Sequence, residues 1–176
     1  MSVLFYRREP SGATPPAPLP PGVMIRIWRP AEDGAPPRGS RRPQNLVWWG
    51  WDLVGVFPQR RFAEISLWRE GRLVHRLILT PRWYRFPFMT PHDLQIGDLW
   101  THPDFRGRGL AHVAIDRAHR EAAGCAGQLW YLVEADNVAS VRLIKSCGYR
   151  LVGAGRRVNP LGIGALGQFH LDQLQS

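Results

Sequence analysis

Apolar side chains alternate with other residues in the first half of the chain, which is the period of a half-buried β-strand. Residues 22–28, GVMIRIW, show this alternation. It also occupies residues 62–68 and 72–79, which flank Glu70 and Gly71. A short connection containing glycine between two such runs is typical of a β-hairpin. The pattern therefore predicts one strand followed by a hairpin.

The second half predicts a strand, a helix, a strand and a second helix, in residues 94–101, 109–123, 128–133 and 137–147. The first helix has a small apolar face, and Gly124 follows it as the expected C-cap; this face consists of Leu110, Ala114, Ala118 and Ala122. The strand QLWYLV is uninterruptedly apolar, as buried parallel strands are. In the second helix, Val141, Ile144 and Cys147 are expected to face inward. Together these elements predict a right-handed crossover unit.

The remaining segments are less regular. Residues 10–22 are rich in proline and small residues, and we interpret residues 1–22 as an N-terminal segment with a connector before one domain, residues 23–176. Residues 45–57 fit either a short helix or a buried strand. Other segments are expected to be a long loop (29–43), irregular structure (81–91), and two short closing strands (149–152 and 168–171) around a glycine-rich stretch.

The chain has 176 residues and a net charge of +9, almost all of it from arginine, because Lys145 is the only lysine. Guanidinium groups pair with phosphate oxygens in a bidentate manner, so the charge suits a nucleotide-containing ligand or a nucleic acid. A genome that favours arginine codons would explain it equally well. The arginines occur as scattered pairs without a nucleic-acid motif, which makes nucleic-acid binding the weaker interpretation.

Cysteine content and hydropathy indicate the compartment. Cys125 and Cys147 are far apart and lack neighbours at metal-ligand spacing, so we expect small buried residues and no metal site. The N-terminal residues lack the apolar stretch of a secretory signal, and the most apolar run, residues 45–57, is too short to span a bilayer. A cytoplasmic location without membrane association is the resulting expectation.

The segment that connects the predicted strand 94–101 to its helix carries the clearest candidate chemistry. It reads RGRG from Arg106 to Gly109. Such a loop leaves backbone N–H groups exposed at a helix N-terminus, and Gly107 and Gly109 lack the Cβ atoms that would block a close approach. Adjacent arginines add positive charge. The loop therefore predicts a pyrophosphate site.

Residues 99–111, LWTHPDFRGRGLA, and 133–149, VEADNVASVRLIKSCGY, resemble the GCN5-related N-acetyltransferase (GNAT) superfamily in order and spacing, over roughly residues 94–153. The resemblance implies an α/β (α+β) fold with a mixed sheet of six or seven strands flanked by helices. It also implies that the parallel central strands separate to admit an acyl-coenzyme A.

The same resemblance implies which residues bind acetyl-coenzyme A. The backbone of Leu99, Trp100 and Thr101 would pair with the pantetheine arm, and Asn137 and Ser140 would make polar contacts near it. Asn137 could equally be a plain helix N-cap. The pyrophosphate would lie on Arg106, Gly107, Arg108, Gly109, Leu110 and Ala111.

Acetyl transfer to an amine also needs a proton acceptor and often an acid for the thiolate. The superfamily frequently supplies the acid as a tyrosine, but Ile144 stands at the matching position. Asp98, just before Leu99, is our first candidate for the base, and Glu134 is the second. The alternative for Asp98 is a carboxylate that only binds neighbouring loop groups. His102, beside the loop, is expected to be structural.

The predicted activity is acetyl transfer to a small-molecule amine, with an amino sugar as the favoured acceptor because Asp98-Leu99 resembles aminoglycoside-type members. Aromatic residues could stack on such a ring, or could be core and homodimer-contact surface; they are Trp48, Trp49, Trp51, Trp83, Tyr84, Phe86 and Phe88. Three alternatives remain: a protein N-acetyltransferase, an acyl-coenzyme A binder without turnover, and a nucleic-acid-binding protein.

Overall fold

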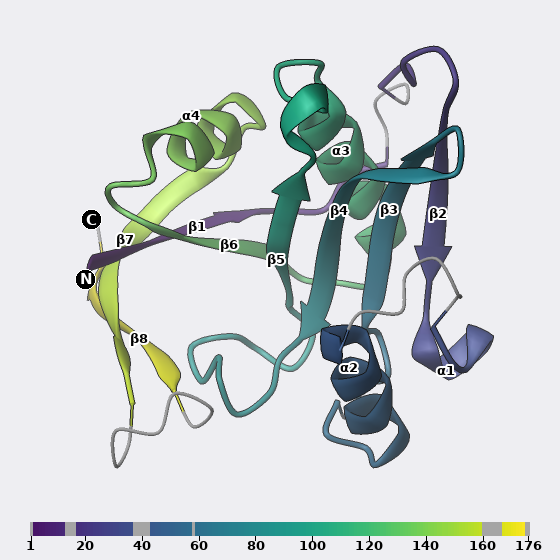
Figure 1. Cartoon of the computed structure of the whole chain (residues 1–176). Helices are drawn as coiled ribbons and strands as arrows, with labels where there is room; N and C mark the ends of the chain where they lie inside the picture. The colour runs from purple at the N-terminus through teal and green to yellow at the C-terminus, as the bar shows by residue number, and fades with distance from the viewer. Residues whose placement is uncertain (1, 13–16, 37–42, 58, 160–166, 175–176) are drawn as a thin grey trace.

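The computed structural model describes residues 2–12, 17–36, 43–57, 59–159 and 167–174, which build one mixed β-sheet with helices on both faces (Figure 1). The described strands follow the spatial order β2-β3-β4-β5-β6-β1-β7-β8. Their bounds are β1 Ser2–Arg8, β2 Val23–Trp28, β3 Ala63–Arg69, β4 Arg72–Pro81, β5 Leu94–Thr101, β6 Leu129–Glu134, β7 Arg150–Val158 and β8 Gln168–Leu174. The helices are α1 Pro30–Asp33, α2 Pro43–Leu53, α3 Leu110–Ala122 and α4 Val138–Ser146, and a 3-10 turn spans Pro103–Phe105.

β5 and β6 form the parallel pair at the centre of the sheet, and they separate along their length. Hydrogen-bonded register joins residues 94–96 of β5 to residues 129–131 of β6. Beyond Ile96 the two strands diverge, so that β5 continues upward in Figure 1 while β6 runs to the left. This confirms the predicted separation of the parallel central strands and opens the sheet at its middle.

β1 is the strand that sequence analysis did not find. It lies between β6 and β7 and pairs antiparallel with both. Phe5 is completely buried on one face of the sheet and Tyr6 is buried on the other. The N-terminal segment is thus a central strand of the sheet, and it brings the strand number to eight among the described residues, against the expected six or seven.

α3 covers the face of the sheet formed by β3, β4 and β5. Its predicted apolar face is buried, with Leu110 and Ala122 at its two ends. Gly124 follows the helix with a φ of 74°, a left-handed conformation that favours glycine and ends the helix as predicted. α4 lies beside α3 over β6, and Ile144 points into the same core. The two helices therefore flank the gap between β5 and β6.

The ambiguous segment after residue 43 is a helix, α2, on the opposite face of the sheet. The Asn45 amide donates a hydrogen bond from Nδ2 to Oε2 of Glu64 in β3 at 2.8 Å, and both side chains are buried. Trp48 stacks on Phe62 with 5.4 Å between ring centroids, and Trp51 lies 4.8 Å from the Trp83 ring. The tryptophans of α2 thus pack with Trp83 in an apolar cluster on this face, as the second of the two interpretations expects, whereas Tyr84 is exposed.

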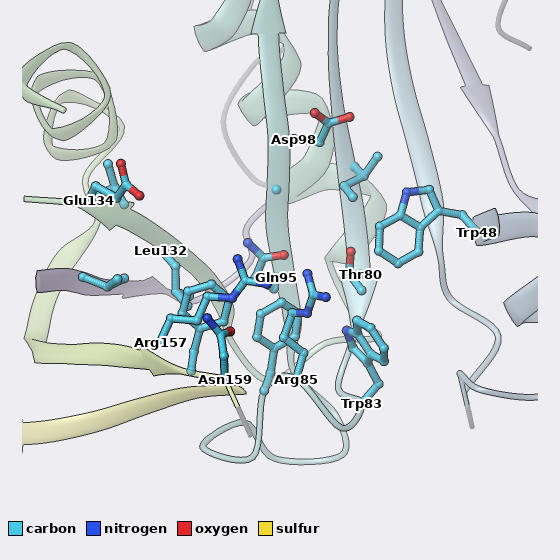
Figure 2. Close-up of a pocket in the computed structure, with 16 residues that line it drawn as sticks. Trp48, Thr80, Trp83, Arg85, Gln95, Asp98, Leu132, Glu134, Arg157 and Asn159 are labelled. Atoms are coloured by element: carbon cyan, nitrogen blue, oxygen red, sulfur yellow. The ribbon is translucent and has the colours of Figure 1, made fainter. Parts of the chain in front are cut away.

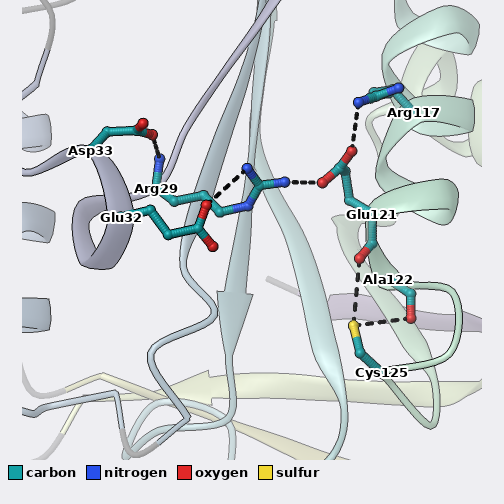
Figure 3. Close-up of polar contacts among 7 residues, drawn as sticks. All are labelled: Arg29, Glu32, Asp33, Arg117, Glu121, Ala122 and Cys125. Atoms are coloured by element: carbon teal, nitrogen blue, oxygen red, sulfur yellow. Dashed lines mark hydrogen bonds and ion pairs between the residues drawn. The ribbon is translucent and has the colours of Figure 1, made fainter.

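A polar network fastens the segment after β2 to the C-terminal half of α3 (Figure 3). Glu121 accepts hydrogen bonds from the guanidinium groups of Arg29 and Arg117, the latter at 2.8 Å. The Arg29 backbone N–H, just before α1, donates to Asp33 Oδ2 at 2.7 Å. The Cys125 thiol lies near the carbonyl of Glu121 at 3.4 Å. These contacts fix the side of the sheet away from the separated strands.

The last two strands are longer than the sequence indicated. β7 runs through the first part of the glycine-rich stretch, because Gly155 lets β8 approach closely: a Cβ there would lie 1.9 Å from the His170 carbonyl oxygen. Residues 160–166, the rest of that stretch, lie outside the described residues. In the part of the chain that the structure describes, no helix is long and apolar enough to cross a membrane.

Candidate active site

A β-bulge interrupts β5 where it leaves β6. Trp100 pairs with Arg76 of β4, but the next register pair joins Gly97 to Ile78, so Asp98 and Leu99 together face a single residue. Asp98 has a φ of 45°, a left-handed conformation that aspartate tolerates better than most residues. The bulge turns Asp98 and Leu99 toward different sides of the strand, and each of them lines a different cavity.

Arg76 holds the bulge through a bidentate ion pair with Asp98. Nε of Arg76 lies 3.1 Å from Oδ2 of Asp98, and Nη2 lies 3.1 Å from Oδ1. The Arg76 side chain is 9% exposed and the Asp98 side chain 38%. The guanidinium also lies 5.0 Å from the Trp100 ring centroid. Asp98 therefore forms an ion pair with Arg76, a partner that the sequence did not indicate.

On the helix side of the bulge, a groove of about 730 Å³ runs from the end of β5 to the N-termini of α3 and α4. Among the described residues, α3 has no side-chain hydrogen bond capping its N-terminus, so its first N–H groups face the groove. The lining includes every residue predicted to bind the cofactor except Asn137, namely Leu99, Trp100, Thr101, Arg106, Gly107, Arg108, Gly109, Leu110, Ala111 and Ser140. The other lining residues are Phe105, His112, Ala139 and Leu143.

The loop before α3 has the shape expected of an anion site. Gly107 and Gly109 have φ values of 72° and 75°, which side chains with a Cβ rarely adopt. The Arg108 guanidinium lies 5.0 Å from the Phe105 ring centroid, and Nε of Arg106 is 3.5 Å from the Thr101 carbonyl oxygen. Two cations and a bare helix N-terminus meet at one end of the groove. These residues fit a pyrophosphate bound against backbone N–H groups.

Asn137 and Ser140 differ in what they contact. Oδ1 of Asn137 accepts a hydrogen bond from the Ser140 N–H at 3.1 Å, which confirms the N-cap interpretation of Asn137. Of the two, only Ser140 is among the residues that line the groove. Its side chain lies near the phenol of Tyr131, whose pKa is raised by burial and lowered to a smaller extent by Ser140. Ile144 has no acidic proton, and it is completely buried in the core, so it is not exposed to the groove.

Besides His112, which lines the groove, two histidines lie near it. Nδ1 of His75 is 2.8 Å from Oγ1 of Thr101, and burial, followed by the nearby charge of Arg76, lowers the pKa of His75 to about 4. His75 is therefore neutral at pH 7. His102 begins the 3-10 turn, where its Nδ1 accepts a hydrogen bond from the Asp104 N–H at 3.3 Å. Its contacts are those of the structural role that we expected.

On the other side of β5, a second cavity of about 620 Å³ contains both carboxylates chosen from the sequence, Asp98 from β5 and Glu134 from the end of β6 (Figure 2). Within the described part of the chain, the Glu134 carboxylate has no ion-pair partner. Aromatic side chains form one wall, and Trp48, Trp83 and Phe86 are those named from the sequence that line it. The other lining residues include Thr80, Arg85, Gln95, Leu132, Arg157, Asn159 and Phe169.

Arg85 and Arg157 are cavity residues that sequence reasoning did not single out. Arg85 follows β4 and Arg157 lies in β7, far apart in the chain. No local sequence motif connects them. They come together because Phe169 of β8 lies between the two segments, and its N–H donates to the Arg85 carbonyl at 3.0 Å. A surplus of arginine was visible in the sequence, but not which arginines would meet.

Comparison with known proteins agrees with this arrangement. The sequence model of the acetyltransferase (GNAT) family matches residues 24–149. No curated protein matches the sequence.

Several solved structures share the fold. A GCN5-related N-acetyltransferase from Sphaerobacter thermophilus is 15% identical, with a TM-score of 0.59, over 87% of this chain and 49% of that one. A GNAT-family acetyltransferase from Novosphingobium aromaticivorans is 18% identical, with a TM-score of 0.54, over 87% of this chain and 60% of that one. This chain therefore spans less than two thirds of either protein.

AAC(6')-Iy, solved with a bisubstrate analog, CoA-S-monomethyl-acetylneamine, is 16% identical, with a TM-score of 0.51, over 73% of this chain and 90% of that one. At these identities the structures show a common fold. The family match covers well over half of the sequence, and it includes both the bulged strand and the loop before α3. The chain belongs to the acetyltransferase (GNAT) family.

Proposed function

We propose that the chain is an N-acetyltransferase that moves the acetyl group of acetyl-coenzyme A to a primary amine of a small molecule, with an amino sugar as one candidate acceptor. One observation carries the proposal: the groove and the cavity lie on the two sides of a single bulge, where Leu99 lines the first and Asp98 lines the second. Two substrates bound there would meet at the gap between β5 and β6.

The groove would hold acetyl-coenzyme A. Arg106, Arg108 and the N–H groups at the start of α3 would bind its pyrophosphate, and the backbone of residues 99–101 would pair with the pantetheine arm. Ser140, at the α4 side, would contact the arm where the strands separate. When bound, this substrate supplies the acetyl thioester.

The contacts favour Glu134 over Asp98 as the group that takes the proton of the amine. Both Asp98 oxygens accept hydrogen bonds from Arg76, whereas Glu134 lines the same cavity without an ion-pair partner among the described residues. Glu134 would attract the substrate ammonium and accept its proton, which frees the nitrogen lone pair for attack. Asp98, held by Arg76, would fix the bulge that carries Leu99.

Because Ile144 cannot supply a proton, the Ser140 hydroxyl would stabilise the departing thiolate by donating a hydrogen bond to it, and the thiolate would take its proton from water. The Tyr131 phenol lies near Ser140, and burial raises its pKa, so that it stays protonated. Tyr131 would thus act as a positioning residue that orients the serine hydroxyl. Tyr131 is in β6, and Ser140 is in the first turn of α4.

The size of the cavity supports a small-molecule acceptor rather than a protein. Its volume of about 620 Å³ lies in the range of small-ligand pockets, and aromatic side chains wall it. The test is a thiol-release assay with acetyl-coenzyme A against amino sugars, aminoglycosides, amino acids, polyamines and short peptides. Release with a small amine and a heat of binding for acetyl-coenzyme A are expected. Calorimetry without such a heat would overturn the proposal, and release with peptides alone would reassign the acceptor.

A further inference from the structure

The acceptor cavity has side chains of opposite charge in different parts of its lining. Its lining contains two carboxylates, from Asp98 and Glu134, and two guanidinium groups, from Arg85 and Arg157. Figure 2 shows the arginine side chains together at the level of Thr80 and Gln95, with the carboxylates farther along β5 and β6. An amine drawn to the carboxylates would leave the rest of the acceptor facing the arginines.

Aromatic side chains hold the two arginines in place. The Arg85 guanidinium lies 5.2 Å from the Trp83 ring centroid, and the Arg157 guanidinium lies 5.8 Å from the Phe169 ring centroid. Phe169 also donates its backbone N–H to the Arg85 carbonyl. Stacking on an aromatic face fixes the plane of a guanidinium and directs its N–H groups outward along the edge, which is the edge that pairs with anions.

The two cations are close enough to affect each other. Burial, and then the charge of Arg157, lower the pKa of the Arg85 guanidinium from its ordinary value. Bringing like charges into a partly buried cavity is unfavourable unless something compensates for it. An anionic group bound between them would remove the repulsion and gain charge-assisted hydrogen bonds.

We propose that the acceptor carries an anionic group, a carboxylate or a phosphate ester, which Arg85 and Arg157 bind while its amine faces Glu134. This inference rests on the proposed function, because it names the class of amine that the same cavity accepts. It also predicts that polycationic amines such as aminoglycosides are poor acceptors, since their additional ammonium groups would face the arginines. The acceptor class thereby narrows to amines that also carry a negative charge.

The experiment compares acceptors that differ only in the anion. Thiol release is measured with glucosamine 6-phosphate against glucosamine, and with an amino acid against its amide. We expect kcat/KM to be higher for the anionic member of at least one pair by about tenfold or more. A preference in the first pair identifies phosphate as the bound group, and a preference in the second pair identifies carboxylate.

Variants assign the effect to the arginines. Arg85→Gln and Arg157→Gln should each lower kcat/KM for the preferred anionic acceptor by about 10- to 100-fold, and change it little for the uncharged partner. Arg156→Gln is the matched control, because this substitution removes the same charge next to Arg157 in β7. The Arg156 guanidinium pairs with Asp172 at 3.3 Å. Binding of the anionic acceptor by calorimetry should weaken in the first two variants alone.

The outcomes separate this inference from the proposed function. Turnover of uncharged or cationic amines at least as fast as that of anionic ones would overturn the inference and leave the acetyltransferase activity intact. An equal loss in Arg156→Gln would also overturn it, because the effect would then be one of net charge. Acetyl-coenzyme A binding without acetylation of any amine would overturn the proposed function, and the inference with it.

Discussion

Arg76 and Asp98 are joined by two hydrogen bonds of 3.1 Å across the β4–β5 pair, at the position where β5 bulges away from β6. Asp98 adopts a positive φ there, a conformation that costs free energy in a residue with a Cβ. The buried Arg76 side chain compensates by fixing the carboxylate in two places. The pair therefore lies at the bulge where the groove and the second cavity adjoin.

The first prediction distinguishes the two carboxylates of the acceptor cavity. Glu134→Gln should lower kcat by about 100-fold or more, because it removes the proposed proton acceptor. Asp98→Asn should lower kcat by about tenfold, because asparagine tolerates the left-handed conformation but accepts a weaker hydrogen bond from Arg76. Both variants should keep their affinity for acetyl-coenzyme A. A larger loss in Asp98→Asn than in Glu134→Gln, measured by thiol release, would exchange the two roles.

The second prediction concerns the loop before α3. Arg106→Gln and Arg108→Gln should each raise the Kd for acetyl-coenzyme A by about tenfold or more, since each removes a charge-assisted contact with the pyrophosphate. Gly109→Ala should also weaken binding, because its φ of 75° is strained for alanine at the start of the helix. Isothermal titration gives the Kd values. The exposed Arg142 on α4 offers the control, and an Arg142→Gln loss of the same size would argue against a local site.

The third prediction tests how Ser140 stabilises the thiolate. Tyr131→Phe should lower kcat by about tenfold at an unchanged Kd for acetyl-coenzyme A, because Ser140 loses the phenol behind it. Tyr149→Phe is the matched control, since its buried hydroxyl has no hydrogen-bond partner among the described residues. Single-turnover kinetics report the chemical step. Equal rates for Tyr131→Phe and the wild type would leave Tyr131 with a packing role only.

The fourth prediction concerns stability away from the site. Glu121→Gln should reduce the free energy of unfolding by about 1–2 kcal/mol, because the Glu121 side chain is 16% exposed and serves two arginines, Arg29 and Arg117. Glu32→Gln should cost less than about 0.5 kcal/mol, because that carboxylate is 66% exposed and lies 3.5 Å from Arg29. Urea denaturation measures both. Similar losses in the two variants would show that burial does not strengthen the Glu121 network.

Local patterns in the sequence predicted the elements that depend on neighbouring residues. The strand of residues 94–101 was placed with its observed bounds, and the RGRG loop correctly marked the start of α3. The turn at Glu70 and Gly71 was found for the same reason, since both residues adopt positive φ values. Where chemistry and conformation are encoded within a few residues, the sequence was sufficient.

Features that depend on distant pairing could not be predicted in this way. β1 has only seven residues, and it becomes a central strand because β6 and β7 supply partners on both sides. The ion pair of Asp98 with Arg76 requires the register of β4 and β5, including its bulge. Arg85 and Arg157 meet only after β8 has placed Phe169 between them. Most residues that line the groove were therefore found from the sequence, whereas most of those that line the second cavity were not.

The last prediction concerns pH and stability. Burial is the largest cause that lowers the pKa of both His75 and His119 to about 4 in the folded chain, against 6.5 for an ordinary histidine. The unfolded chain therefore binds protons that the folded chain does not, and stability falls as the pH decreases below 6.5 toward 4. Between pH 7.5 and 5 each histidine should cost about 2 kcal/mol of unfolding free energy. Urea denaturation at a series of pH values measures this loss. His75→Gln and His119→Gln should each reduce the loss of unfolding free energy between pH 7.5 and 5 by the contribution of one histidine. This holds whatever effect the substitution has on stability at pH 7.5. Unchanged curvature in both variants would assign the acid sensitivity to other groups.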